Sequence, residues 1–406
     1  MTPADQAKLT GVGPGSPMGL LFRRYWLPCA ASSELAPGTA RAVRLLGENL
    51  VVYRTSGGAL GLVAERCPHR GTSLRHGIVD HEGIRCPYHG WKFDGTGLCI
   101  ETPAEAGLIR ARTVAYRVEE LGGLVFAYLG PEPVPLLPRY DLYVWDNVLR
   151  DIGRAVLPCN WLQIMENSVD PTHVEWLHGH HLPQIQQQSG ASPTADYARH
   201  HVRIGFDRFR YGIIKRRIVA GRSEQDEDWQ VGHPLIFPLM LRVGAQGQHR
   251  FQIRVPIDDT HTLHWWYSAY RPAPGKRAPP QPQVPVYEVP WQDAQGNFIL
   301  DFVDGGDIMA WVGQGPIADR SRELLVSSDQ GLVLLRQMYF EELERMQAGH
   351  DPLGVIRDPA ENSVIEFAQE QDKFGAGSAF LQHALEISHV RFSPIRDQIR
   401  QLLEMN

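Results

Sequence analysis

The sequence predicts an α+β protein of two domains, in which an all-β N-terminal domain precedes a domain of antiparallel sheet flanked by helices. The chain has 406 residues, more than one hydrophobic core usually organises. Short strand patterns separated by glycines fill residues 40–130, whereas strand and helix patterns mix after residue 150. A run of strands followed by strands crossed by helices is typical of the α+β class.

The first domain, residues 1–150, opens with an apolar and aromatic segment at 18–30, which we expect to pack on this domain as a short helix or turn. From about residue 40, β-branched and aliphatic residues alternate or cluster between glycines, the pattern of short strands. The segment PEPVPLLPRY at 131–140 holds four prolines. It can continue neither a helix nor a central strand, so we interpret it as a stiff linker or an extended surface segment.

The second domain, residues 151–406, mixes element types. Residues 160–178 follow a helical pattern, and strand-like runs occupy 200–270. A proline-rich loop covers 272–290, and apolar residues near helical spacing predict a long helix within 320–346. This order indicates a sheet crossed by helices.

Composition and charge narrow the class of protein. Hydrophobic residues are 43% and charged residues 21%, the balance of an ordinary globular protein. A net charge of -6 disfavours nucleic acid or an anionic membrane as the main partner. Five cysteines are an odd and sparse set that favours a reducing compartment. No signal-peptide pattern or membrane-length apolar run occurs, so we expect a cytoplasmic protein.

Two short loops carry matched metal ligands. Cys67 and His69 stand in C-P-H-R-G, and Cys86 and His89 stand in C-P-Y-H-G-W. Four such ligands could surround one zinc ion, although structural zinc sites more often pair cysteines first and histidines second. In a Rieske centre two cysteines hold one iron and two histidines hold the other. The spacing resembles the Rieske signature at every ligand position and favours a Rieske [2Fe-2S] cluster.

A second group of ligand-type residues lies in NWLQIMENSVDPTHVEWLH, residues 160–178. His173 and His178 are five residues apart, which places them about 140° apart around an ideal α-helix. Both can reach one metal only if the helix is distorted there, by a π-bulge or an ending turn, and Pro171 makes such a distortion plausible. Taken alone, the pattern is more typical of an ordinary hydrogen-bonded cluster.

Together the two motifs resemble the α subunit of a Rieske non-haem iron oxygenase, of the branch with phthalate dioxygenase, phenoxybenzoate dioxygenase and the aromatic O-demethylases. Thr72 and Tyr88 stand where respiratory Rieske proteins carry a disulfide, which agrees with this resemblance. The resemblance implies a helix-grip fold for the second domain. It also implies a mononuclear Fe(II) held by His173 and His178, with Asp170 bridging to the Rieske histidine of a neighbouring subunit and Asn167 near the iron.

The third iron ligand should be a carboxylate far downstream. Asp301, Asp304 and Asp307 compete for this role. We choose Asp307 because it lies four residues before Trp311, as in the Q-D-x-x-x-W stretch of phthalate-dioxygenase-like members, although Gly306 replaces the glutamine. The alternative for the other two aspartates is a loop or cap role.

The resemblance implies a terminal oxygenase that takes electrons from a separate flavin and iron-sulfur reductase, with NADH or NADPH as donor. With O2 it would hydroxylate, dihydroxylate or O-dealkylate an aromatic compound, and a homotrimer is common in this branch. An aromatic carboxylate calls for a basic residue in the pocket, and the candidates are Arg203, Lys215, Arg216, Arg217 and Arg254. For residues 215–217 we favour a solvated strand edge over a role in the pocket. The alternative function is a Rieske electron carrier without oxygenase chemistry of its own.

Overall fold

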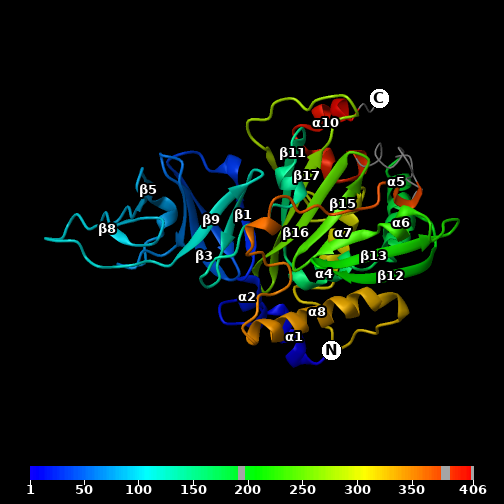
Figure 1. Ribbon diagram of the computed structural model, residues 1–406, viewed down its shortest axis with the longest axis horizontal. Helices are drawn as coiled ribbons and strands as arrows, with labels where there is room; N and C mark the ends of the chain where they lie inside the picture. Colours follow the sequence, from blue (N-terminus) through cyan, green and yellow to red (C-terminus); the bar gives the residue numbers. More distant parts are fainter. Residues whose placement is uncertain (191–196, 376–384, 404–406) are drawn as a thin grey trace.

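The computed structural model describes residues 1–190, 197–375 and 385–403. The chain forms an elongated molecule in which an all-β part occupies one end and a large sheet with helices occupies the other (Figure 1). The predicted α+β class with an N-terminal all-β domain is confirmed. None of the helices in the described part of the chain has both the length and the apolar character needed to cross a membrane.

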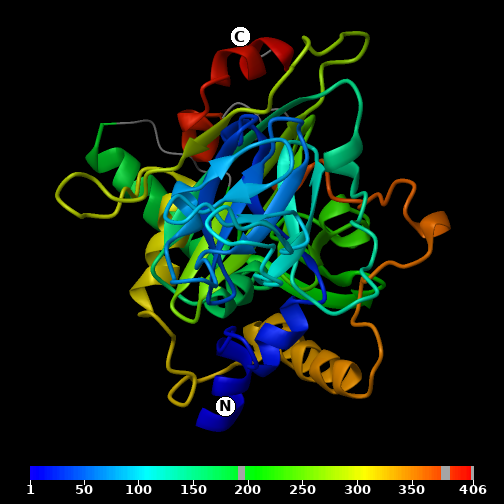
Figure 2. The ribbon, with the colours of Figure 1, turned by 90° about the vertical axis from the view of Figure 1, so that its left-hand side faces the viewer.

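Two antiparallel sheets build the N-terminal part. The larger sheet has the order β1-β10-β9-β4-β3-β2 and the smaller one has the order β5-β6-β7-β8. The cluster loops lie before β5 and between β6 and β7, so the small sheet holds them (Figures 1 and 2). The strands are β1 Trp26–Ala31, β2 Thr39–Leu45, β3 Glu48–Arg54, β4 Leu60–Ala64, β5 Ile78–Val79, β6 Ile84–Arg85, β7 Lys92–Phe93, β8 Cys99–Glu101, β9 Ala115–Leu121 and β10 Leu124–Tyr128.

An eight-stranded sheet in the order β12-β13-β14-β15-β16-β17-β11-β18 forms the centre of the C-terminal part. All neighbouring pairs are antiparallel except β11 with β18, a short edge strand inside the segment that the sequence predicted to be only a loop. The strands are β11 Leu149–Leu157, β12 His201–Phe209, β13 Gly212–Val219, β14 His233–Ile236, β15 Met240–Ala245, β16 Gln248–Asp258, β17 His261–Tyr270 and β18 Val286–Glu288.

Helices from distant parts of the sequence cover this sheet. α4 packs on β16 and contacts both α7 and α8. Trp161 of α4 meets Phe22 and Tyr339 edge to face, with ring centroids 4.8 and 5.0 Å apart. The helices are α1 Pro3–Thr10, α2 Pro17–Phe22, α3 Asp141–Val144, α4 Trp161–Ser168, α5 Leu182–Gln188, α6 Glu227–Gln230, α7 Val303–Gly313, α8 Gln330–Gln347 and α10 Arg396–Leu402.

Two expectations for the helices need correction. The segment at 18–30 belongs to both parts of the molecule. α2 packs on α8, which is a helix of the C-terminal part, whereas β1 joins the N-terminal sheet. The long helix begins at Gln330 and not at residue 320. Leu324, which contributed to the helical pattern, is 87% exposed in the preceding loop.

Candidate functional site

The two cluster loops have the same local structure. In each loop a glycine amide donates to the carbonyl of the cysteine four residues earlier, over 2.8 Å from Gly71 to Cys67 and 3.1 Å from Gly90 to Cys86. Both glycines adopt positive φ angles, +73° and +77°, which L side chains rarely tolerate. The glycines therefore let each loop turn back sharply around its cysteine.

In both loops the cysteine side chain is buried, whereas the histidine side chain lies nearer the surface. Cys67 and Cys86 are each 3% exposed, whereas His69 is exposed and His89 is half-buried. The two imidazole rings lie 4.5 Å apart between centroids, and Trp91 stacks on His69 at 4.6 Å. Two buried thiols behind two surface imidazoles fit the donor set of a Rieske cluster, whose histidine-bound iron would face the surface.

A π-helix, η3 Val174–His181, follows α4 after a short break. The i→i+5 hydrogen bonds of a π-helix stack residues five apart on one face. As a result the rings of His173 and His178 lie 5.4 Å apart between centroids. The helix distortion that the spacing of the two histidines required is therefore present.

The carboxylate of Asp307, on α7, reaches the same point. Its Oδ1 lies 3.2 Å from His178 Nε2 and 3.7 Å from His173 Nε2, and candidate ligand atoms of the three residues all lie within 4.8 Å of one another. Asp307 Oδ1 is buried without a hydrogen-bond partner among the described residues. Two imidazoles and one unsatisfied carboxylate fit the two-histidine, one-carboxylate set that binds iron(II) in oxygenases.

The competing aspartates have other partners. Asp304 is buried one helical turn before Asp307, where it accepts hydrogen bonds from Trp266 Nε1 at 2.7 Å and from the His389 amide at 2.8 Å. Asp301 pairs with Arg391 at 2.7 Å. The carboxylates of Asp301 and Asp304 thus contact other groups, away from His173 and His178. Of the three candidates, Asp307 is the acid that contacts the two histidines.

Asp170 lies beside the three-residue cluster, at the start of the π-helix. Its Oδ1 accepts from the Thr172 amide at 2.7 Å, while its Oδ2 lies 3.5 Å from His173 Nδ1. Burial would raise the pKa of this carboxyl, but the bonds from His173 and Thr172 outweigh burial and lower it. Asp170 and Asn167 both line a second cavity, which His173 also borders. The side chain of Asp170 is 30% exposed, so its carboxylate can be reached from outside.

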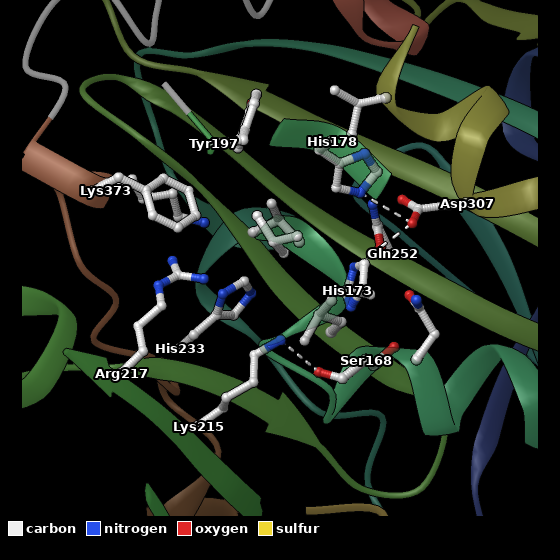
Figure 3. Close-up of a pocket in the computed structure, with 16 residues that line it drawn as sticks. Ser168, His173, His178, Tyr197, Lys215, Arg217, His233, Gln252, Asp307 and Lys373 are labelled. Atoms are coloured by element: carbon white, nitrogen blue, oxygen red, sulfur yellow. Dashed lines mark hydrogen bonds and ion pairs between the residues drawn. The ribbon is translucent and has the colours of Figure 1, made fainter. Parts of the chain in front are cut away.

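The main pocket lies in front of the His173, His178 and Asp307 cluster and encloses about 630 Å³, part of it open to solvent. Asn167 borders this pocket as well as the second cavity. The side chains of Lys215, Arg217 and Lys373 lie on the opposite side from Asp307 (Figure 3). The wall also has five apolar side chains: Val174, Leu241, Val243, Val303 and Phe374, of which Phe374 lies on the cation side, its ring centroid 4.0 Å from the Arg217 guanidinium carbon.

Two of the five candidate cations line this pocket. Lys215 and Arg217 are each 5% exposed, so the interpretation of 215–217 as a solvated strand edge is wrong for them. Arg216, on the other face of β13, binds the main-chain carbonyl of Gln230 at 2.7 Å. Arg203 is on the surface beside Glu224, and Arg254 is buried with its guanidinium on Gln252, at 2.7 Å from Oε1.

Sequence reasoning did not find four polar residues of the pocket wall: Tyr197, His233, Gln252 and Lys373. It also missed Glu370, which pairs with Lys373 at 3.3 Å behind the wall. None of them stands in a motif. Only their place in the fold brings them to the pocket, because they come from separate strands and loops.

The fold and the site together define a class of protein that has two metal centres. One lies in an iron-sulfur cluster domain, and the other is a mononuclear metal site. A family model described as Rieske [2Fe-2S] domain matches residues 25–116, and one described as LigXa C-terminal domain like matches residues 127–277. The chain is 40% identical to the 5,5'-dehydrodivanillate O-demethylase oxygenase subunit of Sphingobium sp. strain SYK-6, over 88% of this chain and 84% of that protein. It is 30% identical to the phthalate 4,5-dioxygenase oxygenase subunit of Pseudomonas putida, over 90% and 92%.

Solved structures agree on the fold. The NdmA QL mutant of Pseudomonas putida CBB5 with theobromine superposes with a TM-score of 0.61 at 20% identity, over 82% of this chain and 94% of that one. The terminal oxygenase of carbazole 1,9a-dioxygenase from Novosphingobium sp. KA1 gives a TM-score of 0.57 at 19% identity, over 83% and 94%. The chain belongs to the Rieske non-haem iron oxygenases, as the oxygenase (α) subunit. Its cofactors are a Rieske [2Fe-2S] cluster and a mononuclear iron. The alternative that the protein is a Rieske electron carrier without oxygenase chemistry is therefore wrong.

Proposed function

We propose that Cys67 and Cys86 hold one iron of the cluster, that His69 and His89 hold the other, and that the mononuclear iron is bound by His173, His178 and Asp307. The observation that carries the second assignment is the approach of three ligand atoms within 4.8 Å of one another in the wall of the main pocket. We also place the domain boundary near residue 150, because β11 begins at Leu149.

The mononuclear iron supplies oxygen activation when it is bound. The residues around it position and shield the reactants. Asp170 Oδ2 lies 3.5 Å from His173 Nδ1, so that this carboxylate would orient the ring with Nε2 toward the metal side. Asn167 offers an amide at the edge of the pocket. The apolar wall keeps water away from a bound ring.

Electron delivery supports a head-to-tail homotrimer. Within one chain the cluster loops lie at the β5 and β8 end of the molecule, whereas the His173 region, beside α4 and α7, lies within the C-terminal part (Figure 1). Asp170 opens to a surface cavity, so the His89 or His69 of another copy can approach it. Tyr88, 55% exposed beside His89, and Leu324, which follows a residue of that cavity, offer apolar surface at the two sites.

Light scattering on the purified protein tests this assembly. We expect three times the chain mass of 45.7 kDa. A monomer that still turns over substrate would contradict the trimer, because its two centres would then have to exchange electrons within one chain.

We further propose that the substrate is an aromatic carboxylate and that a separate flavin and iron-sulfur reductase supplies the electrons from NADH or NADPH. The names of the relatives include phthalate, phenoxybenzoate and 3-chlorobenzoate, and buried cations line the pocket. The protein would act in the cytoplasm, which agrees with five cysteines that are all free and buried.

Turnover with a panel of aromatic acids, a reductase and NADH tests this function. The names of the relatives include an O-demethylase and a dioxygenase, so products are assayed for added oxygen and for formaldehyde. We expect at least one aromatic acid to be converted with NADH consumed. Conversion of neutral aromatics alone would overturn the proposed substrate class.

A further inference from the structure

Lys215 carries the one ammonium group in the pocket wall that has no ion-pair partner among the residues the structure describes. Its Nζ donates to the Ser168 carbonyl at 2.9 Å, and the residue is 5% exposed. An uncompensated buried charge is costly unless a ligand of opposite charge completes it.

The neighbouring cations already have partners. Arg217 binds Asp228 Oδ1 at 3.0 Å and Glu370 Oε1 at 3.2 Å, and Lys373 lies 3.3 Å from the same Glu370 oxygen. Asp228 and Glu370 thus pair with Arg217 and Lys373, whereas Asp170 attracts Lys215 only at longer range. Among the residues that the structure describes, Lys215 is the cation of this group that has no ion pair.

The position of Lys215 suits a ligand that also reaches the mononuclear site. Its side chain points into the pocket from β13, on the side opposite Asp307 (Figure 3). His233, its cross-strand partner on β14, is 8% exposed, and its Nε2 has no hydrogen-bond partner among the described residues. A flat ligand with an oxygen-bearing group at one end would satisfy both residues while its other end meets Asp307.

A purely structural role explains Lys215 less well. Ser168 ends α4, so the ammonium caps the last turn of a helix, where a positive charge is favourable. A neutral amide could make the same hydrogen bond without burying a charge. Burial here, followed by the charge of Arg217, lowers the pKa of Lys215 to about 7. A pKa shift of this size reflects a large free-energy cost of burying the charged ammonium, which a helix cap alone does not explain.

We propose that Lys215 is the anchor for the carboxylate of an aromatic acid whose reacting carbon lies at the opposite, Asp307 end of the pocket. The inference rests on the proposed function, in which this pocket receives the substrate. Arg217 and Lys373 form ion pairs with Glu370 and do not hold the ligand themselves.

Calorimetric binding to the anaerobic holoenzyme tests the anchor with 3-methoxybenzoate and its neutral isostere 3-methoxybenzamide. The wild type should bind the acid at least about ten-fold more tightly than the amide, because a charge-assisted hydrogen bond discriminates by that much. Lys215→Gln keeps the donor for Ser168 and removes the charge, so it should abolish the preference. Lys215→Arg should retain it, and Arg203→Gln, which removes a surface cation, should bind like the wild type.

The outcomes separate the two proposals. A wild type that prefers the acid, together with a Lys215→Gln variant that keeps this preference, overturns the anchor and leaves the substrate class standing; this result would also follow if the carboxylate bound the iron directly. A wild type that shows no preference for the acid overturns both. If Lys215→Gln unfolds, Lys215→Met decides, since it keeps the length of the side chain and removes the charge: loss of the preference supports the anchor, and a retained preference overturns it.

Discussion

Asp304 and Asp307 lie one turn apart on α7 but have different partners. Asp304 is fully engaged by Trp266 and the His389 amide, whereas Asp307 faces the two histidines. We expect Asp307→Ala to lower the iron content from about three to about two per chain, because the cluster keeps its two irons. Metal analysis with a visible spectrum checks this.

Asp301→Ala is the matched control, since that carboxylate pairs with Arg391. It should retain about three irons per chain. An Asp307→Ala variant with full iron content would remove this residue from the ligand set.

The buried ammonium of Lys215 should also make the stability of the protein depend on pH. Burial lowers the pKa of its ammonium from 10.5 to about 7 in the folded protein. Between these pH values the unfolded state binds more protons, so this group makes stability rise with pH. The difference in thermal midpoint between wild type and Lys215→Gln should therefore shift in favour of the wild type from pH 7 to about pH 10. A constant difference would mean that Lys215 titrates normally.

At the scale of single residues, the sequence predicted the residues that stand in motifs. The cluster loops and the two histidines of the 160–178 segment are short-range patterns whose spacing follows from ligand chemistry. Lys215 differs, because its burial depends on α4 and on the loop at 370–373. Nothing within the β13 sequence distinguishes it from a surface lysine.

The π-helix η3 is the element on which the mononuclear site depends most. Glu175 anchors it to β12 through the His201 amide at 3.0 Å. We expect Glu175→Ala to release the mononuclear iron about ten-fold faster to a chelator, because loss of support around ligands typically costs that much affinity. The cluster spectrum should not change.

His200→Ala is the control for this change, because it removes only an exposed ring 3.1 Å from Glu175. Equal iron release from both variants would show that the Glu175 anchor does not support the ligands. A helix distortion could be predicted from the five-residue spacing alone, but its extent could not, since the anchor comes from a distant strand. The start of α8 was misjudged because exposed leucines at 324–325 imitate a buried helical face.

The whole molecule separates its two centres along its long axis (Figure 1). The two-domain α+β plan follows from composition and strand patterns. The packing of α1 and α2 on the C-terminal half could not be predicted, because it is set by contacts with α4 and α8, which are far away in the sequence.

Asp170 connects this arrangement to function. Asp170→Asn keeps an oxygen to accept the Thr172 amide but can no longer accept at both carboxylate oxygens. We expect about three irons per chain to remain while substrate turnover falls by at least about ten-fold. Iron analysis and NADH-driven product formation check this.

Asp319→Ala changes another carboxylate of the same cavity, whose hydrogen bonds within the described part of the chain go to nearby Ser321. This variant should turn over normally. Unchanged turnover in Asp170→Asn would mean that electrons reach the mononuclear site by a route that does not involve this carboxylate.

A single-turnover experiment tests the central claim most directly, that one protein both stores electrons in its cluster and oxygenates an aromatic acid. The protein is reduced without oxygen, freed of reductant, and mixed with O2 and an aromatic acid that turns over in the steady state. The account predicts that the visible spectrum of the oxidised cluster returns while oxygenated or demethylated product forms in the absence of any reductase, and that Asp307→Ala forms none. Return of the spectrum without product in the wild type would contradict it.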